Sequence, residues 1–255
     1  MKAFGPQGWW PVTPRGAAAP AYVPGRYGAP ADAGAFEICA GAVLTQNTAW
    51  TNVEKALAAM RAAGLTTPEA VAACPEGRLA AAVRSSGYYR QKAARLKEFC
   101  ARALHEHQEG LAAWFAAAGA AELRAELLSY KGVGPETADS MALYAAAKPC
   151  FVIDAYTRRA GERYGLARGL SYDGWKALFE AALPPDVKMY NEYHALLVRL
   201  GKDFCRKTKP LCAACPLGPA CAKDIYGTRK SGRTAGRRGV RQGPRRAEKV
   251  PRRRR

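Results

Sequence analysis

The sequence lacks any apolar run that approaches the ~20 residues needed to cross a membrane. It also lacks a secretory signal, because residues 1–6 lead into Pro- and Gly-rich sequence and not into an apolar segment with a cleavage site. We therefore expect a cytoplasmic protein that does not bind membranes. Thiols stay reduced in the cytoplasm, so the eight cysteines are expected to be free, metal-bound or catalytic, and not paired in disulfides.

Acidic residues are scarce. The chain has 21 Asp and Glu against 40 Lys and Arg, which gives a formal net charge of +19. Residues 227–255 hold thirteen of the basic residues and only Glu248, so they carry +12 and leave +7 on the rest of the chain. This charge predicts a polyanionic partner whose binding depends on salt. A basic surface that only aids solubility is the alternative that charge leaves open.

Alternating apolar and polar residues, which are typical of β-strands, are also absent apart from the short apolar run 150–153. From Phe36 to about Leu200 apolar residues recur at steps of three and four, which predicts an all-α fold. Residues 1–32 are rich in Pro, Gly and Ala and predict an irregular N-terminal arm. Residues 227–255 have almost no apolar side chains and predict a disordered basic tail.

Half of the cysteines are clustered within 17 residues, with gaps of six, two and five residues: Cys205, Cys212, Cys215 and Cys221. Thiolates so close in sequence can bind one metal centre, and the Pro and Gly residues among them favour tight turns. Zinc and a [4Fe–4S] cluster both fit, although such unequal gaps are unusual for a zinc ribbon. The four cysteines that lie singly in apolar surroundings are expected in the core: Cys39, Cys74, Cys100 and Cys150.

A Gly-Val-Gly turn at residues 132–134 follows a helical pattern that ends near Tyr130, and Pro135 opens the next helix. Glycines allow close backbone approach, and the amide N–H groups that point outward here can hold a phosphate oxygen without reading a base. A Gly-x-Gly turn between helices is, by itself, most often only a turn.

Asp154 follows the apolar residues 151–153 and precedes a helical pattern, so it is expected to cap that helix. Hydrogen bonds from amide groups there would favour its ionised form. An ionised carboxylate beside a sugar C1′ can stabilise an oxocarbenium-like transition state and orient the attacking water. An N-cap with no chemical role is the alternative reading of this aspartate.

These features stand in the same order as in the endonuclease III superfamily of DNA glycosylases, which the chain resembles over about residues 36–225. The turn leads into Thr137-Ala138 as in the helix-hairpin-helix motif of that superfamily, Asp154 follows by about twenty residues, and the cysteine spacing matches its iron–sulfur loop. The resemblance implies a [4Fe–4S] cluster on the four clustered cysteines and a catalytic role for Asp154. It also implies a nucleoid-associated monomer whose partner is double-stranded DNA containing a damaged base.

The resemblance further implies two helical lobes with the active site in the groove between them. Residues 33–148 would form a six-helix barrel with the helix-hairpin-helix at 122–147, and residues 149–226 a cluster lobe joined by the arm 1–32. Gln46, in the segment 41–48, matches the glutamine that fills the gap left by a flipped nucleotide. Tyr88 matches the residue that wedges into the DNA, although packing aromatics are the alternative for Tyr88 and its neighbour Tyr89. Further DNA contacts are expected from Lys131, Gly132, Val133, Gly134, Thr137, Arg206 and Lys207, of which the last two would otherwise be a solvated turn.

Within the superfamily the chain is most similar to the 3-methyladenine glycosylases of endonuclease III type. The resemblance lies in residues 41–48, 86–93 and 134–139, and in an N-terminal Trp-Trp-Pro that implies Trp9, Trp10 and Glu136 in the base pocket. Electron-rich indole rings stack well on cationic alkylated purines, which therefore are the expected substrates. The cysteine loop is a departure from that class. If the arm is mobile, the two tryptophans are only a hydrophobic anchor.

Glu136 stands where bifunctional members carry a lysine whose amine attacks C1′. A carboxylate cannot form an imine, so we predict a monofunctional DNA N-glycosylase with weak or absent AP lyase activity. The alternatives are a uracil or thymine-mismatch glycosylase, a bifunctional glycosylase/AP lyase, and a non-catalytic protein that binds DNA damage. Removal of adenine opposite 8-oxoguanine is disfavoured, because those enzymes usually carry an extra C-terminal domain.

Overall fold

The computed structural model describes residues 3–28 and 30–223, so the predicted basic tail lies outside the described residues. The described chain is helical, which confirms the predicted all-α fold. It forms no β-strand, and only one isolated bridge pairs Val12 with Ala21. The helices are α1 (Asp32–Leu44), α2 (Trp50–Ala62), α3 (Pro68–Ala73), α4 (Glu76–Ala82), the 3₁₀ turn η1 (Arg84–Ser86), α5 (Tyr89–Glu106), α6 (Leu111–Ala117), α7 (Ala120–Ser129), α8 (Pro135–Ser140), the π-helix η2 (Met141–Ala145), α9 (Ala155–Tyr164), α10 (Tyr172–Ala182) and α11 (Val187–Asp203).

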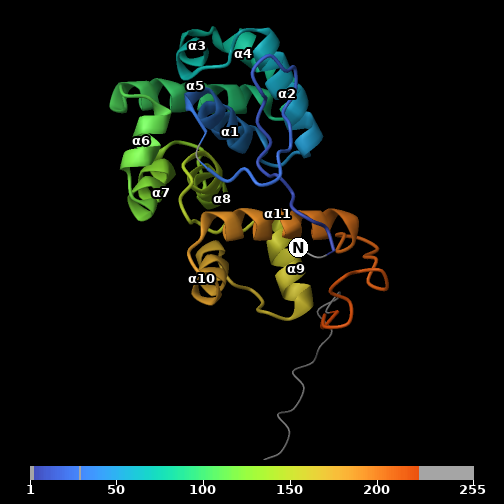
Figure 1. The fold of residues 1–255 in the computed structure, drawn as a ribbon. Coiled ribbons are helices and arrows are strands. Elements are labelled where there is room, and N and C mark those ends of the chain that lie inside the picture. Colours follow the sequence, from blue (N-terminus) through green and yellow to red (C-terminus); the bar gives the residue numbers. More distant parts are fainter. Residues whose placement is uncertain (1–2, 29, 224–255) are drawn as a thin grey trace, which may run out of the picture. The chain divides into compact units, whose positions relative to one another are not determined.

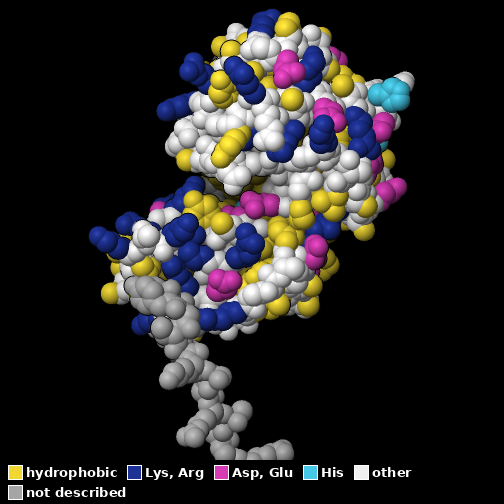
Figure 2. Space-filling model, turned by 180° about the vertical axis from the view of Figure 1, so that it is seen from behind, with side chains coloured by type: hydrophobic (Ala, Val, Ile, Leu, Met, Phe, Trp, Pro, Cys, Tyr) yellow, Lys and Arg dark blue, Asp and Glu magenta, His cyan; other side chains and the backbone are white. Residues whose placement is uncertain are grey.

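The helices gather in two lobes (Figure 1). Helices α1 to α8 form the first lobe and α9 to α11 the second. Helix α1 is the centre of the first lobe, since every residue from Ala35 to Leu44 is buried. A helix that is apolar all round must be covered on every side, and α2, α5, α6 and η2 pack around this one. On the face in Figure 2 Lys and Arg side chains lie on both lobes.

Side chains cap several helix starts, and the prediction that the four scattered cysteines lie in the core is confirmed. Thr67 caps α3, with its hydroxyl accepting from the Ala70 amide, and Pro68 takes the first helical position. Ser171 caps α10 in the same way. The four scattered cysteines are all buried. No helix in the described part of the chain is long and apolar enough to cross a membrane.

Aromatic side chains fill the second lobe. Phe151 and Phe179 stack with ring centroids 4.5 Å apart and an interplanar angle of 3°. Trp175 is fully buried and packs on Gly161, where an added Cβ would lie 2.8 Å from the indole ring. The extended run 151–153 enters this core as irregular buried backbone, which explains why its apolar pattern looks strand-like.

Buried charges tie the two lobes together. Asp139 on α8 is fully buried and accepts from the Arg124 guanidinium of α7 at 2.8 Å. On α10 of the second lobe, Lys176 lies 3.5 Å from Asp139, and Asp173 binds Arg124 at 2.7 Å. Removing one partner of such a buried pair is strongly destabilising, because it strands a charge in the interior.

Two buried glutamates hold the N-terminal arm across both lobes. Glu37 on α1 accepts from the Thr13 amide at 2.8 Å and from the Thr13 hydroxyl at 2.7 Å. Glu192 on α11 accepts from the Gln7 amide and, at 2.9 Å, from the Tyr27 hydroxyl. The irregular arm is therefore pinned, and it carries its tryptophans to the junction of the lobes.

Candidate active site

A pocket of about 480 Å³ opens where the arm, the first lobe and the second lobe meet. Its size falls in the range of small-molecule sites. Segments far apart in the sequence contribute its walls: Trp9, Trp10 and Tyr22 of the arm; Thr45, Thr48, Ala49, Trp50, Thr51 and Glu54 around the start of α2; Glu136 and Ser140 of α8; residues 152 and 154–156; and His194, Val198 and Lys202 of α11. Three of the predicted site residues besides Asp154 thus line one cavity.

Three tryptophans form one wall of this pocket. The ring centroids of Trp9 and Trp10 are 5.3 Å apart, and Trp50 lies 4.9 Å from the first and 5.1 Å from the second. Trp10 packs on Gly41 of α1, where an added Cβ would lie 3.1 Å from the indole. Lys202 Nζ lies 5.9 Å from the Trp9 ring. The two arm tryptophans are therefore fixed parts of the pocket, and Trp50, which the sequence did not indicate, joins them.

Asp154 is the N-cap of α9, as predicted, and its Oδ1 accepts from the Thr157 amide at 2.6 Å. The side chain is buried. Its Oδ2 lies 3.7 Å from Nε2 of His194, whose Nδ1 is 2.6 Å from the Tyr144 hydroxyl. Burial works to raise the pKa of Asp154, but the neighbouring His194 and the amide of Thr157 outweigh it, so the pKa is lowered.

Glu136 lies in the first turn of α8 and faces the pocket. Its side chain is exposed to that cavity, yet surrounding protein atoms desolvate the carboxyl group. Desolvation and the negative charge of Asp154 raise the pKa of Glu136. Two carboxyl groups in one pocket are thus shifted in opposite directions, an arrangement that lets one stay ionised while the other holds a proton.

The hairpin between α7 and α8 has the predicted form, with α7 ending at Ser129 and α8 beginning at Pro135. Gly132 has a φ of +81°, the left-handed conformation that favours glycine. Gly134 differs from the expectation, since its φ is −92° and needs no glycine. A Cβ at Gly134 would meet nothing within 4 Å, so this glycine keeps the surface open for close approach.

The other residues predicted to contact DNA lie near the hairpin or on exposed loops. Gln46 donates its amide to the Gly132 carbonyl and to the Thr137 hydroxyl, both at 3.0 Å. Tyr88 is 72% exposed and has a φ of +46°. Lys131 is exposed, with its amine 3.9 Å from Glu98, and it does not line the pocket.

The four clustered cysteines are partly exposed and follow α11. Burial raises the pKa of the Cys215 thiol, and the proximity of the other three thiols of the cluster raises it further. Gly218 fits between the Cys212 and Cys215 carbonyls, where a Cβ would lie 2.8 and 2.9 Å from the oxygens.

Arg163 on α9 fixes the basic loop between the first two cysteines. Its guanidinium donates to the carbonyls of Arg206 at 2.6 Å and Lys207 at 3.0 Å, and to the Cys205 sulfur at 3.5 Å. The backbone of the loop is therefore held from behind, while the side chains of Arg206 and Lys207 are exposed.

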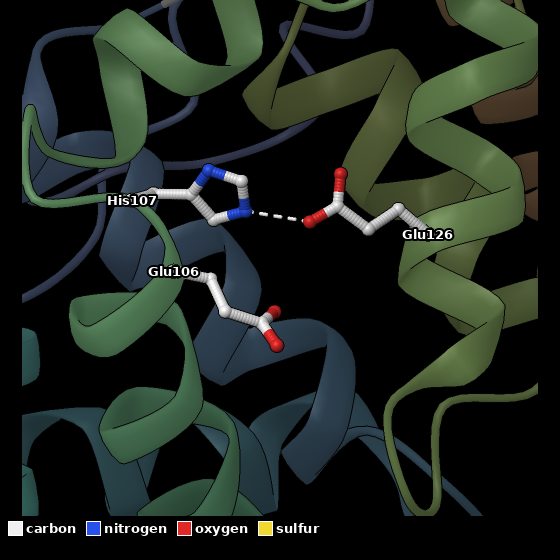
Figure 3. A group of neighbouring side chains, drawn as sticks. All are labelled: Glu106, His107 and Glu126. Carbon is white, nitrogen blue, oxygen red and sulfur yellow. Dashed lines mark hydrogen bonds and ion pairs between the residues drawn. The ribbon is translucent and has the colours of Figure 1, made fainter.

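A second group of polar side chains lies away from this pocket, where the end of α5 meets α7 (Figure 3). His107 Nε2 is 2.5 Å from Glu126, its ring stacks on Trp114, and the Trp114 indole donates to the same glutamate at 3.1 Å. Glu106 is held by Arg102. These groups satisfy one another, so we interpret them as a packing contact of the first lobe.

The chain is similar in sequence to known DNA repair proteins. Residues 40–185 match the sequence model of the HhH-GPD superfamily of base excision DNA repair proteins, and the chain belongs to this family. A protein of Methanocaldococcus jannaschii named as a candidate DNA repair glycosylase is 38% identical over 86% of this chain and 90% of its own length. Endonuclease III of Thermotoga maritima is 29% identical over 79% of this chain and 88% of its own length.

Solved structures agree. The 3-methyladenine DNA glycosylase of H. pylori bound to 1,N6-ethenoadenine is similar over 66% of this chain and 84% of its own, with 29% identity and a TM-score of 0.59. An endonuclease III–DNA complex is similar over 77% of this chain and 86% of its own, with 26% identity and a TM-score of 0.64. The predicted family resemblance is therefore confirmed.

Proposed function

We propose that this chain is a monofunctional DNA glycosylase that hydrolyses the N-glycosidic bond of a damaged base extruded from double-stranded DNA. Alkylated purines are the favoured substrates. The observation that carries the proposal is the position of Asp154. It is a buried carboxylate whose pKa is lowered, and it lies in the wall of a pocket that three tryptophans line.

The catalytic role of Asp154 follows from electrostatics. Breaking an N-glycosidic bond develops positive charge on the sugar, and a carboxylate held in a dry pocket stabilises that charge without having to reorganise. The Thr157 amide and His194 keep the carboxylate ionised and fix its orientation. Asp154 would also orient the water that attacks C1′.

The tryptophan wall favours a flat, electron-poor base. Trp9, Trp10 and Trp50 present indole faces and edges, and such rings attract cationic alkylated purines by stacking and cation–π contact. The H. pylori 3-methyladenine glycosylase that resembles this chain holds a modified adenine, 1,N6-ethenoadenine, which supports a modified purine as the substrate here. Cationic alkylated purines already leave readily, so for them the pocket needs little additional catalysis.

Glu136 supports a monofunctional reaction. It lines the pocket from α8, as Ser140 does, and the charge of Asp154 acts on it; a carboxyl group cannot form the imine that AP lyase chemistry requires. Lys131 is exposed and outside the pocket lining, so its amine is not positioned to replace the missing nucleophile.

DNA contacts are proposed on the surface around the pocket. The open backbone at Gly134 would hold phosphate oxygens, next to Gly132, which Arg95 covers, and to Val133 and Thr137, whose side chains are buried. Tyr88 would stack in the duplex where the nucleotide has left, and Gln46 would lie beside that gap. Lys131 and the basic loop with Arg206 and Lys207 would add phosphate contacts.

A [4Fe–4S] cluster is proposed on Cys205, Cys212, Cys215 and Cys221. The residues fit the group, because four partly exposed thiols lie on one short loop, the other three raise the pKa of Cys215, a Cβ at Gly218 would clash with two carbonyls of the loop, and Arg163 donates to one sulfur. Charge compensation by the metal would remove the repulsion among the thiolates, and the cluster would hold the basic loop in shape.

We also propose how the chain is divided into domains. We infer a barrel domain at residues 33–148, a cluster domain at 149–226 that residues 1–32 join, and a basic tail at 227–255. We also infer that the protein acts as a monomer on nucleoid DNA in the cytoplasm.

A single-turnover assay tests the proposed function. Duplexes that carry 3-methyladenine, 1,N6-ethenoadenine, uracil, hypoxanthine or 8-oxoguanine are incubated with the protein and with Asp154→Asn. We expect excision of an alkylated purine, slowed by about 10²–10³-fold in the variant. The asparagine can still cap α9, so the fold is retained. Excision of uracil alone would contradict the substrate proposal, and no excision from any duplex would favour a binding protein.

A further inference from the structure

Two basic side chains on α5, Lys92 and Arg95, connect the loops that carry the proposed DNA-inserting residues. Lys92 is 2% exposed, although its side chain is charged. Its ammonium donates to the Leu44 carbonyl at 2.9 Å and to the Ser86 carbonyl at 2.6 Å. A buried ammonium is costly unless it is hydrogen-bonded, so these two contacts are the reason that this lysine is tolerated in the interior.

Each of the two carbonyls lies at the end of a helix, just before a loop that carries a proposed DNA-contacting residue. Leu44 is the last residue of α1, and the loop that begins one residue later carries Gln46. Ser86 is the last residue of η1, and Tyr88 follows it by two residues. Carbonyls at a helix end have no partner within the helix and carry partial negative charge, so a cation is well placed there. One ammonium therefore anchors the starts of both loops.

Arg95, one turn further along α5, extends the connection to the hairpin. Its guanidinium donates to the Gln46 side-chain oxygen at 3.3 Å. It also packs on Gly132, where an added Cβ would lie 2.6 Å from the Arg95 Nε. The nitrogen of the same Gln46 amide binds the Gly132 carbonyl, so α5, the first loop and the hairpin form a closed set of contacts.

Both anchored loops contain a residue in the left-handed conformation. Asn47 has a φ of +54° and Tyr88 a φ of +46°. Residues other than glycine adopt this conformation at a cost, and an aromatic side chain does so only where the surroundings impose it. An anchor at the start of each loop supplies that constraint.

We propose that Lys92, assisted by Arg95, is a positioning residue that holds Gln46, Tyr88 and the hairpin in one fixed arrangement, so that they enter DNA together. This inference rests on the proposed function. Lys92 itself is buried and does not touch DNA. Without it the loops would still exist, but they would have to be ordered at each binding event, and that ordering would weaken lesion-specific binding more than general DNA binding.

The chain provides a matched control. Lys97 lies on the same helix, and its ammonium also donates to two backbone carbonyls, those of Ala72 and, at 2.6 Å, Cys74. These carbonyls belong to the end of α3, which carries none of the proposed DNA-contacting residues. Lys92→Met and Lys97→Met therefore remove the same kind of contact from one helix and differ in the loops that they release.

The test uses a DNA duplex that carries a tetrahydrofuran abasic analogue in one strand and 2-aminopurine directly opposite it in the other strand. This probe needs no knowledge of the excised base. The binding preference for this duplex over an undamaged one is measured, together with the 2-aminopurine fluorescence. We expect Lys92→Met to lose about tenfold of the preference and most of the fluorescence change, because two hydrogen bonds to a charged group are lost. Lys97→Met should keep both.

Hydrogen exchange gives a second readout in the same proteins. Amides of residues 45–49 and 86–89 should exchange faster in Lys92→Met, while those of α3 should do so in Lys97→Met. Lys92→Gln, which keeps two N–H donors, serves as the milder variant if the methionine protein does not fold. Equal preference and equal loop exchange in the Lys92 and Lys97 variants would overturn the inference. A full-length protein without any preference for the abasic duplex would instead contradict the proposed function.

Discussion

His194 Nε2 lies 3.7 Å from Asp154 Oδ2, and the Tyr144 hydroxyl holds the opposite ring nitrogen at 2.6 Å. The histidine comes from α11 and the aspartate from the start of α9. The pairing thus joins two helices of the second lobe at the pocket, and it is one reason why the pKa of this buried aspartate is lowered.

Replacing His194 should shift the acid limb of the pH–rate profile for base excision to higher pH. The neighbouring His194 lowers the pKa of Asp154, so His194→Phe should raise that pKa. In the proposed reaction Asp154 acts as a carboxylate, so activity should be lost as the pH falls through its pKa. The variant should therefore lose activity at a higher pH than the unmodified protein does. Single-turnover rates across the acid range measure this, with His194→Gln as the milder change. Identical acid limbs would refute the role assigned to His194.

Glu136 should make the stability of the folded protein fall as the pH rises. Its pKa is raised by desolvation and by Asp154, so the folded state holds the proton more firmly than the unfolded chain does. This contribution is complete below the ordinary pKa of a glutamate and is lost as the pH rises through the raised pKa. Glu136→Gln should therefore raise the melting temperature at neutral pH and change it little in acid. A gain of the same size at every pH would show that desolvation of the carboxylate is not the cause.

The proposal that no amine of the protein acts as a Schiff-base nucleophile can be tested with borohydride and abasic DNA; Lys202, which lines the pocket, is the amine to replace if an adduct forms. The protein should give no covalent adduct, and Lys131→Ala should behave in the same way, because Lys131 lies outside the pocket lining. Glu136→Lys places an amine beside Asp154 and should produce an adduct visible on a denaturing gel. An adduct formed by the unmodified protein and lost in Lys131→Ala would overturn the assignment of a monofunctional enzyme.

Metal analysis tests the cysteine loop. Anaerobically purified protein should contain about four iron and about four sulfide per chain and absorb broadly in the visible range. Cys215→Ser should lose most of both. Cys100→Ser is the matched control, because that cysteine is buried in the first lobe, and it should retain them. One zinc per chain without sulfide would identify a zinc site instead.

The basic tail, which lies outside the described residues, should act through charge alone. Removing residues 227–255 takes away +12 of the +19. Fewer released counterions should flatten the slope of log affinity against log salt and weaken binding at low salt, while the preferred lesion stays the same. Titrations at several salt concentrations measure the slope. Equal slopes for the full and shortened chains would exclude this role.

The sequence predicted features that depend on neighbouring residues. The Gly-Val-Gly turn, Pro135 at a helix start and Asp154 as an N-cap are all local relationships, and each appears in the structure as expected. The burial of the four scattered cysteines could also be predicted, because their sequence surroundings are apolar.

Contacts between distant segments could not be predicted in this way. His194 lies forty residues after Asp154, and nothing in its helical surroundings indicates that it meets the aspartate. The burial of Lys92 depends on where α1 and η1 end, which no local pattern around the lysine indicates. The tilted and edge-to-face contacts of Trp50 with the arm tryptophans likewise follow from packing. A helical pattern predicts which residues face inward, but not which inward faces meet.

The arm's two anchors have a consequence for biosynthesis. Gln7 binds Glu192, 185 positions later in the chain, whereas Thr13 binds Glu37, only 24 positions away. On the ribosome the early attachment can form soon after α1 emerges, but the late one must wait until nearly the whole described chain has been made. A nascent or prematurely ended polypeptide therefore carries its tryptophans without a finished cavity, and the cavity is complete only after α11 has been made.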